Sequence, residues 1–273
     1  MIGNKFTVLM SVYYNEKKEN LILAIDSLLN QTLAPNQIVI VEDGKLPDDL
    51  YNCLEEYSKK HKIIHLIKLD ENQGLGNALN EGLKHCKYDY VARMDADDIS
   101  VENRFEKQIS FLENNPEVDV LGGQIMEFDD KTNKDISTRT VPSKMSDLKK
   151  FIKTRNPFNH MTVVFKKKSV DDAGGYKDCK YFEDYYLWAR MLAKNNNLQN
   201  IDDVVVRARA GTDMTERRGG MQYLKCIKNF EDKLFELKII NRFEYVKNIA
   251  LRSVVALIPN KLRYYIYQKK LRG

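Results

Sequence analysis

The sequence predicts an α/β protein with a mostly parallel sheet flanked by helices. Strand-like apolar runs alternate with helical patterns through almost the first hundred residues. Several of these runs end in polar side chains, and ligands of parallel sheets bind beyond the carboxyl ends of the strands. Of the 273 residues, 43% are hydrophobic and 30% are charged, which indicates a globular chain rather than a disordered one.

The first half of the chain supplies strands and helices in alternation. Apolar runs of strand length lie at residues 6–12, 37–41 and 63–69 and from Tyr90 onward, and helical spacing occurs at residues 19–30, 47–60 and 74–85. Pro47 suits the start of its helix, because the first turn needs no N–H from that residue. This order predicts right-handed βαβ units.

The second half contains shorter elements. We expect a helix at residues 103–115 that ends before Pro116, a polar loop at 129–138, and strands at 118–121, 124–128 and 161–165. Another helix opens near Tyr181. Glu183 and Asp184 lie in its first turn, where the helix dipole favours acidic side chains.

Three carboxylates follow the fourth strand within four residues: Asp95, Asp97 and Asp98. Acids this close repel one another unless a cation lies among them. Oxygen ligands without a nearby His or Cys suit Mg²⁺ or Mn²⁺. The alternative is a solvated acidic turn that caps the next helix, and the wider context of the sheet decides between the two.

Polar residues follow all four strands of the first half: Ser11 and Tyr13, Asp43, Asn72, and then Asp95 and Asp97. Because these strand ends meet at one edge of the sheet, they predict a nucleotide site there. The chain has no phosphate-binding loop, and its only near match to a dinucleotide fingerprint, at residues 74–76, lacks the third glycine. A metal bound by carboxylates is the remaining means of holding phosphates.

Six motifs occur in a characteristic order: VLMSVYYNE followed by SLLNQTL, IVIVEDG, ENQGLGNALNEGL, YVARMDADD followed by Arg104, and FEDYYLWARM. Together they cover roughly residues 5–210, and the chain resembles the family 2 glycosyltransferases, which are inverting GT-A enzymes with nucleotide-sugar donors. The likeness extends to bacterial enzymes that build capsule, exopolysaccharide or O-antigen repeats. It implies a GT-A catalytic domain at residues 1–215, with a nucleotide-binding half at 1–122 and an acceptor half at 123–215, and a helical basic extension at 216–273.

The resemblance also implies a set of donor-binding residues. Asp43 would accept the uracil imide N–H, although the chain has Glu42-Asp43-Gly44-Lys45 where the family usually has D-D-G-S. Asp97 would hold Mg²⁺ or Mn²⁺ against the diphosphate of a UDP- or dTDP-type donor. Arg217 and Arg218 match a loop that closes over the diphosphate, or else form an exposed basic loop. The other implied donor contacts are Ser11, Val12, Tyr13, Glu16, Asn72, Asp95 and Ala96.

On the acceptor side the resemblance assigns Asp184 as the base that deprotonates the acceptor hydroxyl, with Glu183 as the second candidate. The alternative is that both acids only stabilise the helix terminus. His160 is a candidate acceptor contact or a structural histidine. Trp188 is a candidate sugar platform or a core residue of its amphipathic helix.

Residues 242–273 contain eight Lys or Arg and a single acid, Glu244, interleaved with apolar and aromatic residues. This pattern is typical of an amphipathic segment on anionic lipid, and the alternative is a helix packed on the catalytic domain or on a second subunit. We expect no nucleic-acid partner. Four scattered cysteines and no signal-like leader indicate a cytoplasmic protein, with the basic tail at the inner face of the cell membrane.

The leading hypothesis is an inverting glycosyltransferase that moves a sugar from a UDP-sugar to a glycan or lipid-linked acceptor in bacterial surface polysaccharide synthesis. A nucleotidyltransferase is disfavoured, because the YYNEKK segment after the first strand is not a glycine- and arginine-rich loop. A non-catalytic sugar-nucleotide-binding subunit is disfavoured by the presence of Asp95, Asp97 and Asp184. The identities of the sugar, the acceptor and the linkage are not encoded in these patterns.

Overall fold

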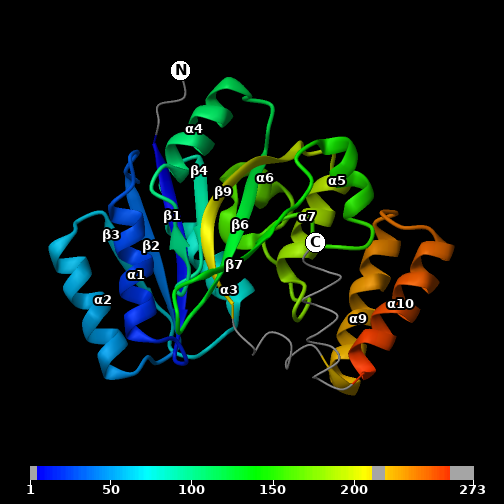
Figure 1. Cartoon of the computed structure of the whole chain (residues 1–273), viewed down its shortest axis with the longest axis horizontal. Coiled ribbons are helices and arrows are strands. Elements are labelled where there is room, and N and C mark those ends of the chain that lie inside the picture. The colour runs from blue at the N-terminus through cyan, green and yellow to red at the C-terminus, as the bar shows by residue number, and fades with distance from the viewer. Residues whose placement is uncertain (1–4, 211–218, 259–273) are drawn as a thin grey trace.

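A mixed sheet runs through the centre of the computed structural model, which describes residues 5–210 and 219–258 (Figure 1). Its strand order is β3-β2-β1-β4-β8-β6-β9-β5, and β7 pairs with β6. The first four strands in sequence are parallel, as predicted: β1 (Phe6–Tyr13), β2 (Gln37–Asp43), β3 (Ile64–Lys68) and β4 (Tyr90–Met94). Their carboxyl ends therefore lie at one edge of the sheet.

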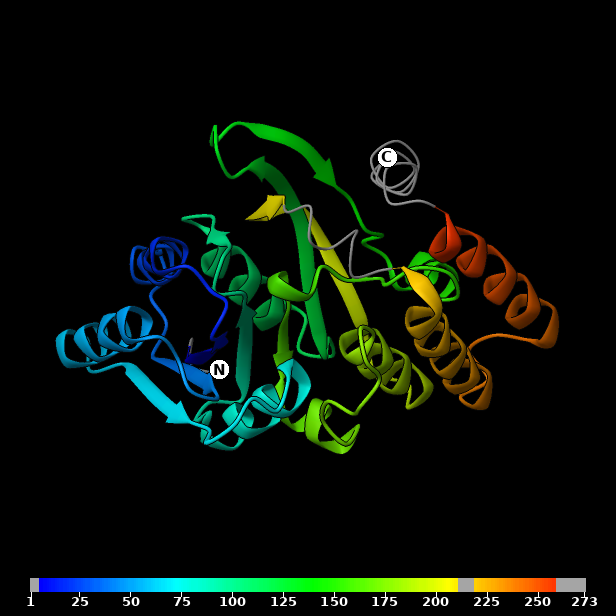
Figure 2. The ribbon, with the colours of Figure 1, turned by 90° about the horizontal axis from the view of Figure 1, so that it is seen from below.

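Helices cover both faces of these strands, because the strands are apolar on both sides. Val8, Met10 and Ile40 pack with α1 (Lys18–Leu29) and α2 (Asp48–Lys60), whereas Leu9 and Val41 pack with α3 (Leu75–His85). The view from below shows α1 and α2 on one side of the sheet and α3 on the other (Figure 2). This is the arrangement expected of consecutive βαβ units.

The second half extends the sheet with antiparallel and parallel strands. A short strand, β8 (Val164–Lys166), pairs antiparallel with both β4 and β6 (Val120–Asp129). A long strand, β9 (Leu198–Ala210), runs parallel to β6, and it also pairs antiparallel with β5 (Ile99–Ser100). The sheet is therefore mixed, which is what the GT-A fold implied by the resemblance requires.

Several predicted boundaries in this half are wrong. The strands expected at 118–121 and 124–128 are one strand, β6, because Gly122 and Gly123 do not break it. A Cβ atom on Gly122 would lie 2.1 Å from Asn200 Oδ1, so this glycine allows a close approach of β9. The loop expected at 129–138 contains β7 (Asp135–Arg139), and the strand expected at 161–165 is divided between a 3₁₀ turn, η1 (His160–Thr162), and β8. The strand β9 has no clear apolar alternation and was not predicted.

Of the remaining helices, α4 (Arg104–Asn114) packs against the first half of the chain, where Phe105 contacts Phe6 of β1, and the others belong to the second half. These others are α5 (Met145–Phe151), α6 (Lys167–Asp172), α7 (Glu183–Ala193), α9 (Gly220–Glu236) and α10 (Arg242–Leu257). The last two lie side by side at one end of the molecule (Figure 1). The ring centroids of Phe182 and Phe230 are 4.5 Å apart, so α9 packs at the start of α7. The described part of the basic extension therefore shares an apolar core with the predicted acceptor half.

A glycine pair tests how tightly the strand-end loops are packed. Gly44 and Gly74 both have positive φ angles, and a side chain there costs about 1–3 kcal/mol of backbone strain. A Cβ on Gly44 would also lie 2.5 Å from the backbone nitrogen of Asn72, whereas one on Gly74 would meet no atom within 4 Å. We expect Gly44→Ala to lower the free energy of unfolding clearly more than Gly74→Ala in urea titrations. Equal losses would contradict this close approach.

Candidate active site

The three acids after β4 form a compact cluster. Carboxylate oxygens of Asp95, Asp97 and Asp98, one from each, all lie within 4.8 Å of one another. The guanidinium of Arg93, which is 1% exposed, forms an ion pair with Asp95. Asp98 is buried and accepts a hydrogen bond from the backbone N–H of Arg209 at 2.8 Å. The half-buried Asp97 carboxylate is therefore the least constrained of the three by the groups around it.

The charges of this cluster are poorly compensated by the protein. Burial, and then the charges of Asp95 and Glu16, raise the pKa of Asp97 to about 7. Burial and the charges of Asp97 and Asp95 raise the pKa of Asp98 well above its ordinary value. A divalent cation would offset this repulsion, and a set of carboxylate oxygens suits Mg²⁺ or Mn²⁺. The residues present therefore fit the implied metal.

The predicted base-recognition residue, Asp43, organises the loop after β3. Its Oδ1 accepts from the backbone N–H of Gln73 at 2.7 Å, and its Oδ2 accepts from that of Gly74 at 3.1 Å. The Nδ2 group of Asn72 donates both to Asp43 Oδ2 at 3.0 Å and to its backbone oxygen at 3.1 Å. Because a carboxylate has about four acceptor sites, Asp43 retains one for a ligand. Both amide hydrogens of Asn72 are donated to Asp43, so Asn72 holds Asp43 in position.

The end of β1 brings Glu16 toward the acidic cluster, as the effect on Asp97 shows. Glu16 Oε1 accepts from the Lys17 backbone N–H at 2.8 Å, which holds the turn before α1. The side chains of Val12 and Ala96 are buried, so their contribution to a ligand contact is limited to the backbone. Tyr13 is exposed and Ser11 is half-buried. The predicted diphosphate-loop residues Arg217 and Arg218 lie outside the described residues.

The acids predicted for the acceptor side, Glu183 and Asp184, lie in the first turn of α7. Asp184 Oδ2 accepts a hydrogen bond from Asn156 Nδ2 at 2.5 Å. Burial raises the pKa of Asp184, and the hydrogen bond from Asn156 opposes that rise. Burial also raises the pKa of Glu183. Both carboxyls are therefore more basic than exposed ones, which is the direction required of a general base near neutral pH.

His160 and Trp188 pack against each other. His160 Nε2 is 2.9 Å from the hydroxyl of Tyr176, and burial, followed by the charge of Arg93, lowers the pKa of His160 well below its ordinary value. The imidazole is therefore neutral at physiological pH. Trp188 is 0% exposed and packs edge-on against Phe158 and His160. This burial favours the core alternative for Trp188, and the indole offers no free face to a sugar.

Arg93 was not predicted as a site residue, although a charged residue within an apolar strand was a signal for it. Its charge acts on Asp97, on Asp184 and on His160, so the donor and acceptor candidates surround one buried guanidinium. Asn156 and Arg209 were missed as well. Their contacts join segments that are far apart in the sequence, and no local pattern predicts them.

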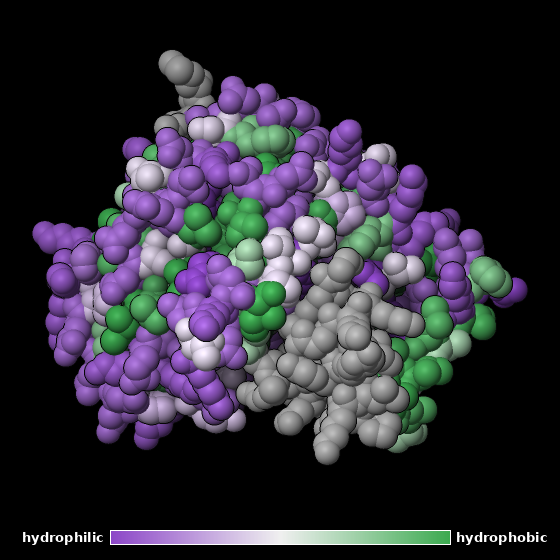
Figure 3. Space-filling view, viewed as in Figure 1, coloured by the Kyte–Doolittle hydropathy of each residue, from purple (hydrophilic) through white to green (hydrophobic). Residues whose placement is uncertain are grey.

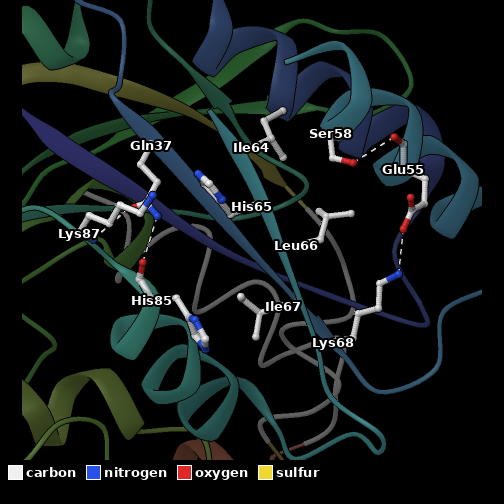
Figure 4. A pocket seen from close by; sticks show the side chains of 10 residues that line it. All are labelled: Gln37, Glu55, Ser58, Ile64, His65, Leu66, Ile67, Lys68, His85 and Lys87. Atoms are coloured by element: carbon white, nitrogen blue, oxygen red, sulfur yellow. Dashed lines mark hydrogen bonds and ion pairs between the residues drawn. The ribbon is translucent and has the colours of Figure 1, made fainter. Parts of the chain in front are cut away.

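Two surface hollows lie away from these acids. One, of about 510 Å³, flanks the edge strand β3 (Figure 4). Lys68 in that hollow is already paired with Glu55 at 2.8 Å. The other, of about 590 Å³, lies at the turn between α9 and α10. Neither lining includes a predicted site residue, so these hollows are not part of the candidate site.

The sequence model described as Glycosyl transferase family 2 matches residues 8–172, which is more than half of the chain. The chain belongs to glycosyl transferase family 2. This confirms the resemblance drawn from the six motifs, and the enzyme class is glycosyltransferase. The match covers β1 to β4 and the acidic cluster, the region in which the motifs are densest.

Two curated relatives cover nearly the whole chain. The amylovoran biosynthesis glycosyltransferase AmsE of Erwinia amylovora is 38% identical and covers 98% of this chain and 100% of its own length. The Escherichia coli UDP-Gal:alpha-D-GlcNAc-diphosphoundecaprenol beta-1,3-galactosyltransferase is 36% identical and covers 98% of this chain and 97% of its own length.

Solved structures share the fold at low sequence identity. Residues 1–349 of Staphylococcus aureus TarS with UDP-GlcNAc align at 18% identity and a TM-score of 0.67, covering 98% of this chain and 76% of that one. The mannosyltransferase PcManGT of Pyrobaculum calidifontis, with GDP-Man and Mn²⁺, aligns at 14% identity and a TM-score of 0.63, covering 97% and 76%. The predicted GT-A fold is confirmed.

The concentration of negative charge at Asp97 predicts that Asp97→Asn raises the free energy of unfolding, whereas the control Asp119→Asn lowers it. Because the folded pKa of Asp97 is raised, its ionised form destabilises the fold, and this cost grows as the pH rises from the ordinary value toward 7 and above. In metal-free protein at about pH 8, Asp97→Asn should raise the free energy of unfolding by up to about 4 kcal/mol, the full value of a pKa shift from 3.8 to about 7. Addition of Mn²⁺ should stabilise the wild type but not this variant.

Asp119→Asn is the matched control. Burial opposes ionisation of Asp119, but hydrogen bonds from the Asn197 backbone N–H and the Ser169 hydroxyl outweigh it and lower its pKa. The same substitution should therefore destabilise the fold at that pH. Urea unfolding with and without Mn²⁺ measures both effects. A loss of stability in Asp97→Asn would contradict the proposed crowding.

Proposed function

We propose that this family 2 enzyme is an inverting glycosyltransferase. It transfers a sugar from a UDP-sugar to a lipid-linked glycan acceptor in the synthesis of a bacterial surface polysaccharide. The observation that carries the proposal is the pairing of two acidic sites around Arg93: the crowded cluster at Asp97 and the basic carboxylate of Asp184. The names of the two relatives, one for exopolysaccharide synthesis and one for a lipid-linked acceptor, support the substrate class.

Each residue has a distinct part in this reaction. Asp43 accepts the imide N–H of the nucleobase, and Asp97 would hold the divalent ion together with Asp95. When bound, that ion neutralises charge on the departing nucleoside diphosphate. Asp184 takes the proton of the acceptor hydroxyl as its oxygen attacks the anomeric carbon from the face opposite the diphosphate. A single displacement of this kind inverts the configuration.

A substitution at Asp184 tests this assignment. Asp184→Asn keeps the shape of the side chain but removes the base, so transfer should fall by about 10²–10⁴-fold, while the thermal stabilisation by UDP with Mn²⁺ is retained. Glu183→Gln is the matched control and should lose less activity.

A panel of UDP-, GDP- and dTDP-sugars, assayed by nucleoside diphosphate release, identifies the donor. Full transfer by Asp184→Asn would assign the base elsewhere, and activity that survives EDTA would remove the metal from the proposal.

We also propose that α10 contacts the membrane surface. Within the described residues, no helix is long and apolar enough to span a bilayer. The helix carries an exposed apolar stripe that lies at one end of the molecule (Figure 3). We name it the α10 stripe; its members, spaced three or four residues apart, are Phe243, Val246, Ala250, Val254 and Leu257. Basic residues of the segment 242–273 complement anionic lipid.

Point substitutions test the stripe better than removal of residues 242–273, because α10 also buries Asn248 against the domain. The double variant Phe243→Ser/Val254→Ser should lose most of its co-sedimentation with vesicles that contain anionic phosphatidylglycerol, because it removes apolar area from the stripe. Leu23→Ser, at an exposed apolar position on α1, is the control and should sediment like the wild type. Equal sedimentation of all three proteins would contradict the membrane contact.

A further inference from the structure

The face of α10 opposite its stripe holds the short segment 152–156 that follows α5. Asn248 Nδ2 donates to the backbone oxygen of Lys153 at 2.7 Å, and Arg252 Nη2 donates to that of Thr154 at 2.9 Å. Two consecutive backbone oxygens are therefore fixed by side chains one helical turn apart on the same helix.

These two side chains are themselves held by a buried acid. Glu231 of α9 is 0% exposed; its Oε1 lies 2.9 Å from Arg252 Nε, and its Oε2 accepts from Asn248 Nδ2 at 3.1 Å. A buried ion pair of this kind contributes little net stability, but it has strict geometric requirements. Arg252 and Asn248 therefore reach the segment 152–156 from fixed positions.

The other end of the segment contacts the proposed base. The Oδ1 atom of Asn156 accepts from the backbone N–H of Phe158 at 3.2 Å, which turns Nδ2 toward Asp184. The hydroxyl of Tyr185 donates to the backbone oxygen of Ile152 at 2.6 Å, so α7 touches the segment a second time. A continuous set of contacts thus leads from α10 to the carboxylate at the start of α7.

We propose that Asn156 is a positioning residue for Asp184, and that Arg252 and Asn248 of α10 keep Asn156 in place through the backbone of residues 153 and 154. The base role of Asp184 rests on the proposed function, whereas the contacts themselves do not. The C-terminal helices then act on the acceptor side of the active site from a distance, without touching substrate.

The hydrogen bond from Asn156 is one of several interactions that set the pKa of Asp184. A donor to the ionised carboxylate stabilises that form, so its loss should make the carboxylate more basic. The other charged and titratable groups that act on Asp184 come from β4, β7, α7 and the loop before α7, and they remain unchanged when Asn156 is replaced: Arg93, Arg139, Glu183, Tyr185 and Tyr176.

Titration of the Asp184 carboxyl carbon by NMR tests the proposal directly. The full-length protein carries ¹³C-labelled aspartate, and Asp184→Asn identifies the signal. We expect Asn156→Ala to raise the Asp184 pKa by about one unit. Asn156→Asp should raise it further, because it places a like charge beside the carboxylate. Arg252→Gln should produce a smaller shift in the same direction.

Arg242→Gln is the matched control, since Arg242 is an exposed residue of the same helix outside this set of contacts. It should leave the Asp184 titration unchanged. An unshifted Asp184 pKa in folded Asn156→Ala would overturn the positioning role of Asn156. A shift with Arg242→Gln as large as with Arg252→Gln would overturn the role of α10.

Activity assays separate this inference from the proposed function. With the donor found in the panel, the acidic limb of kcat against pH should move upward in Asn156→Ala by the same amount as the pKa, with little change in the donor KM. If wild-type protein transfers no sugar, the proposed function fails, and the NMR titration still decides whether Asn156 and Arg252 position Asp184. If Asp184→Asn is inactive and the pH profile of Asn156→Ala is unchanged, the inference alone fails.

Discussion

The candidate active site is arranged around one buried cation, Arg93. A guanidinium inside an apolar strand is costly unless an acid compensates for it, and Asp95 does so at the end of the same strand. The positive charge of Arg93 also affects the protonation of three other side chains. It favours the ionised forms of Asp97 and of Asp184, and it disfavours protonation of His160. The predicted donor and acceptor acids thus both feel the charge of Arg93, although burial has the larger effect on each.

The acids around this centre have different roles because their surroundings differ. Asp98 is buried against the backbone N–H of Arg209, which ties β9 to the turn after β4. Asp97, beside Asp95 and Glu16, carries charge that the described residues leave poorly balanced. The excess of negative charge favours a bound divalent ion with open positions for phosphate oxygens. Asp184 lies separately in the first turn of α7, where the proposed function places the base for the acceptor.

Much of the nucleotide-binding half could be predicted from the sequence. β1 and β2 are buried and read as continuous apolar runs. These two strands and the half-buried edge strand β3 are found to within two residues. The second half was harder. The paired glycines of β6 resemble a break, and the central acids of β9 conceal its strand character. Both features follow from contact between the two strands, which local patterns do not show.

The sequence by itself determined the family, the order of elements in the first half of the chain and the identity of the acids at the strand ends. These follow from local patterns, because strand ends and helix starts set which residues can reach the sheet edge. Only the tertiary structure decided how those residues are held. Asn72 donates a hydrogen bond to Asp43, Asn156 donates one to Asp184, and Trp188 is fully buried in the core. Some contacts of this kind join residues about a hundred positions apart in the sequence, as Arg252 and Thr154 are, and only folding of the chain brings them together.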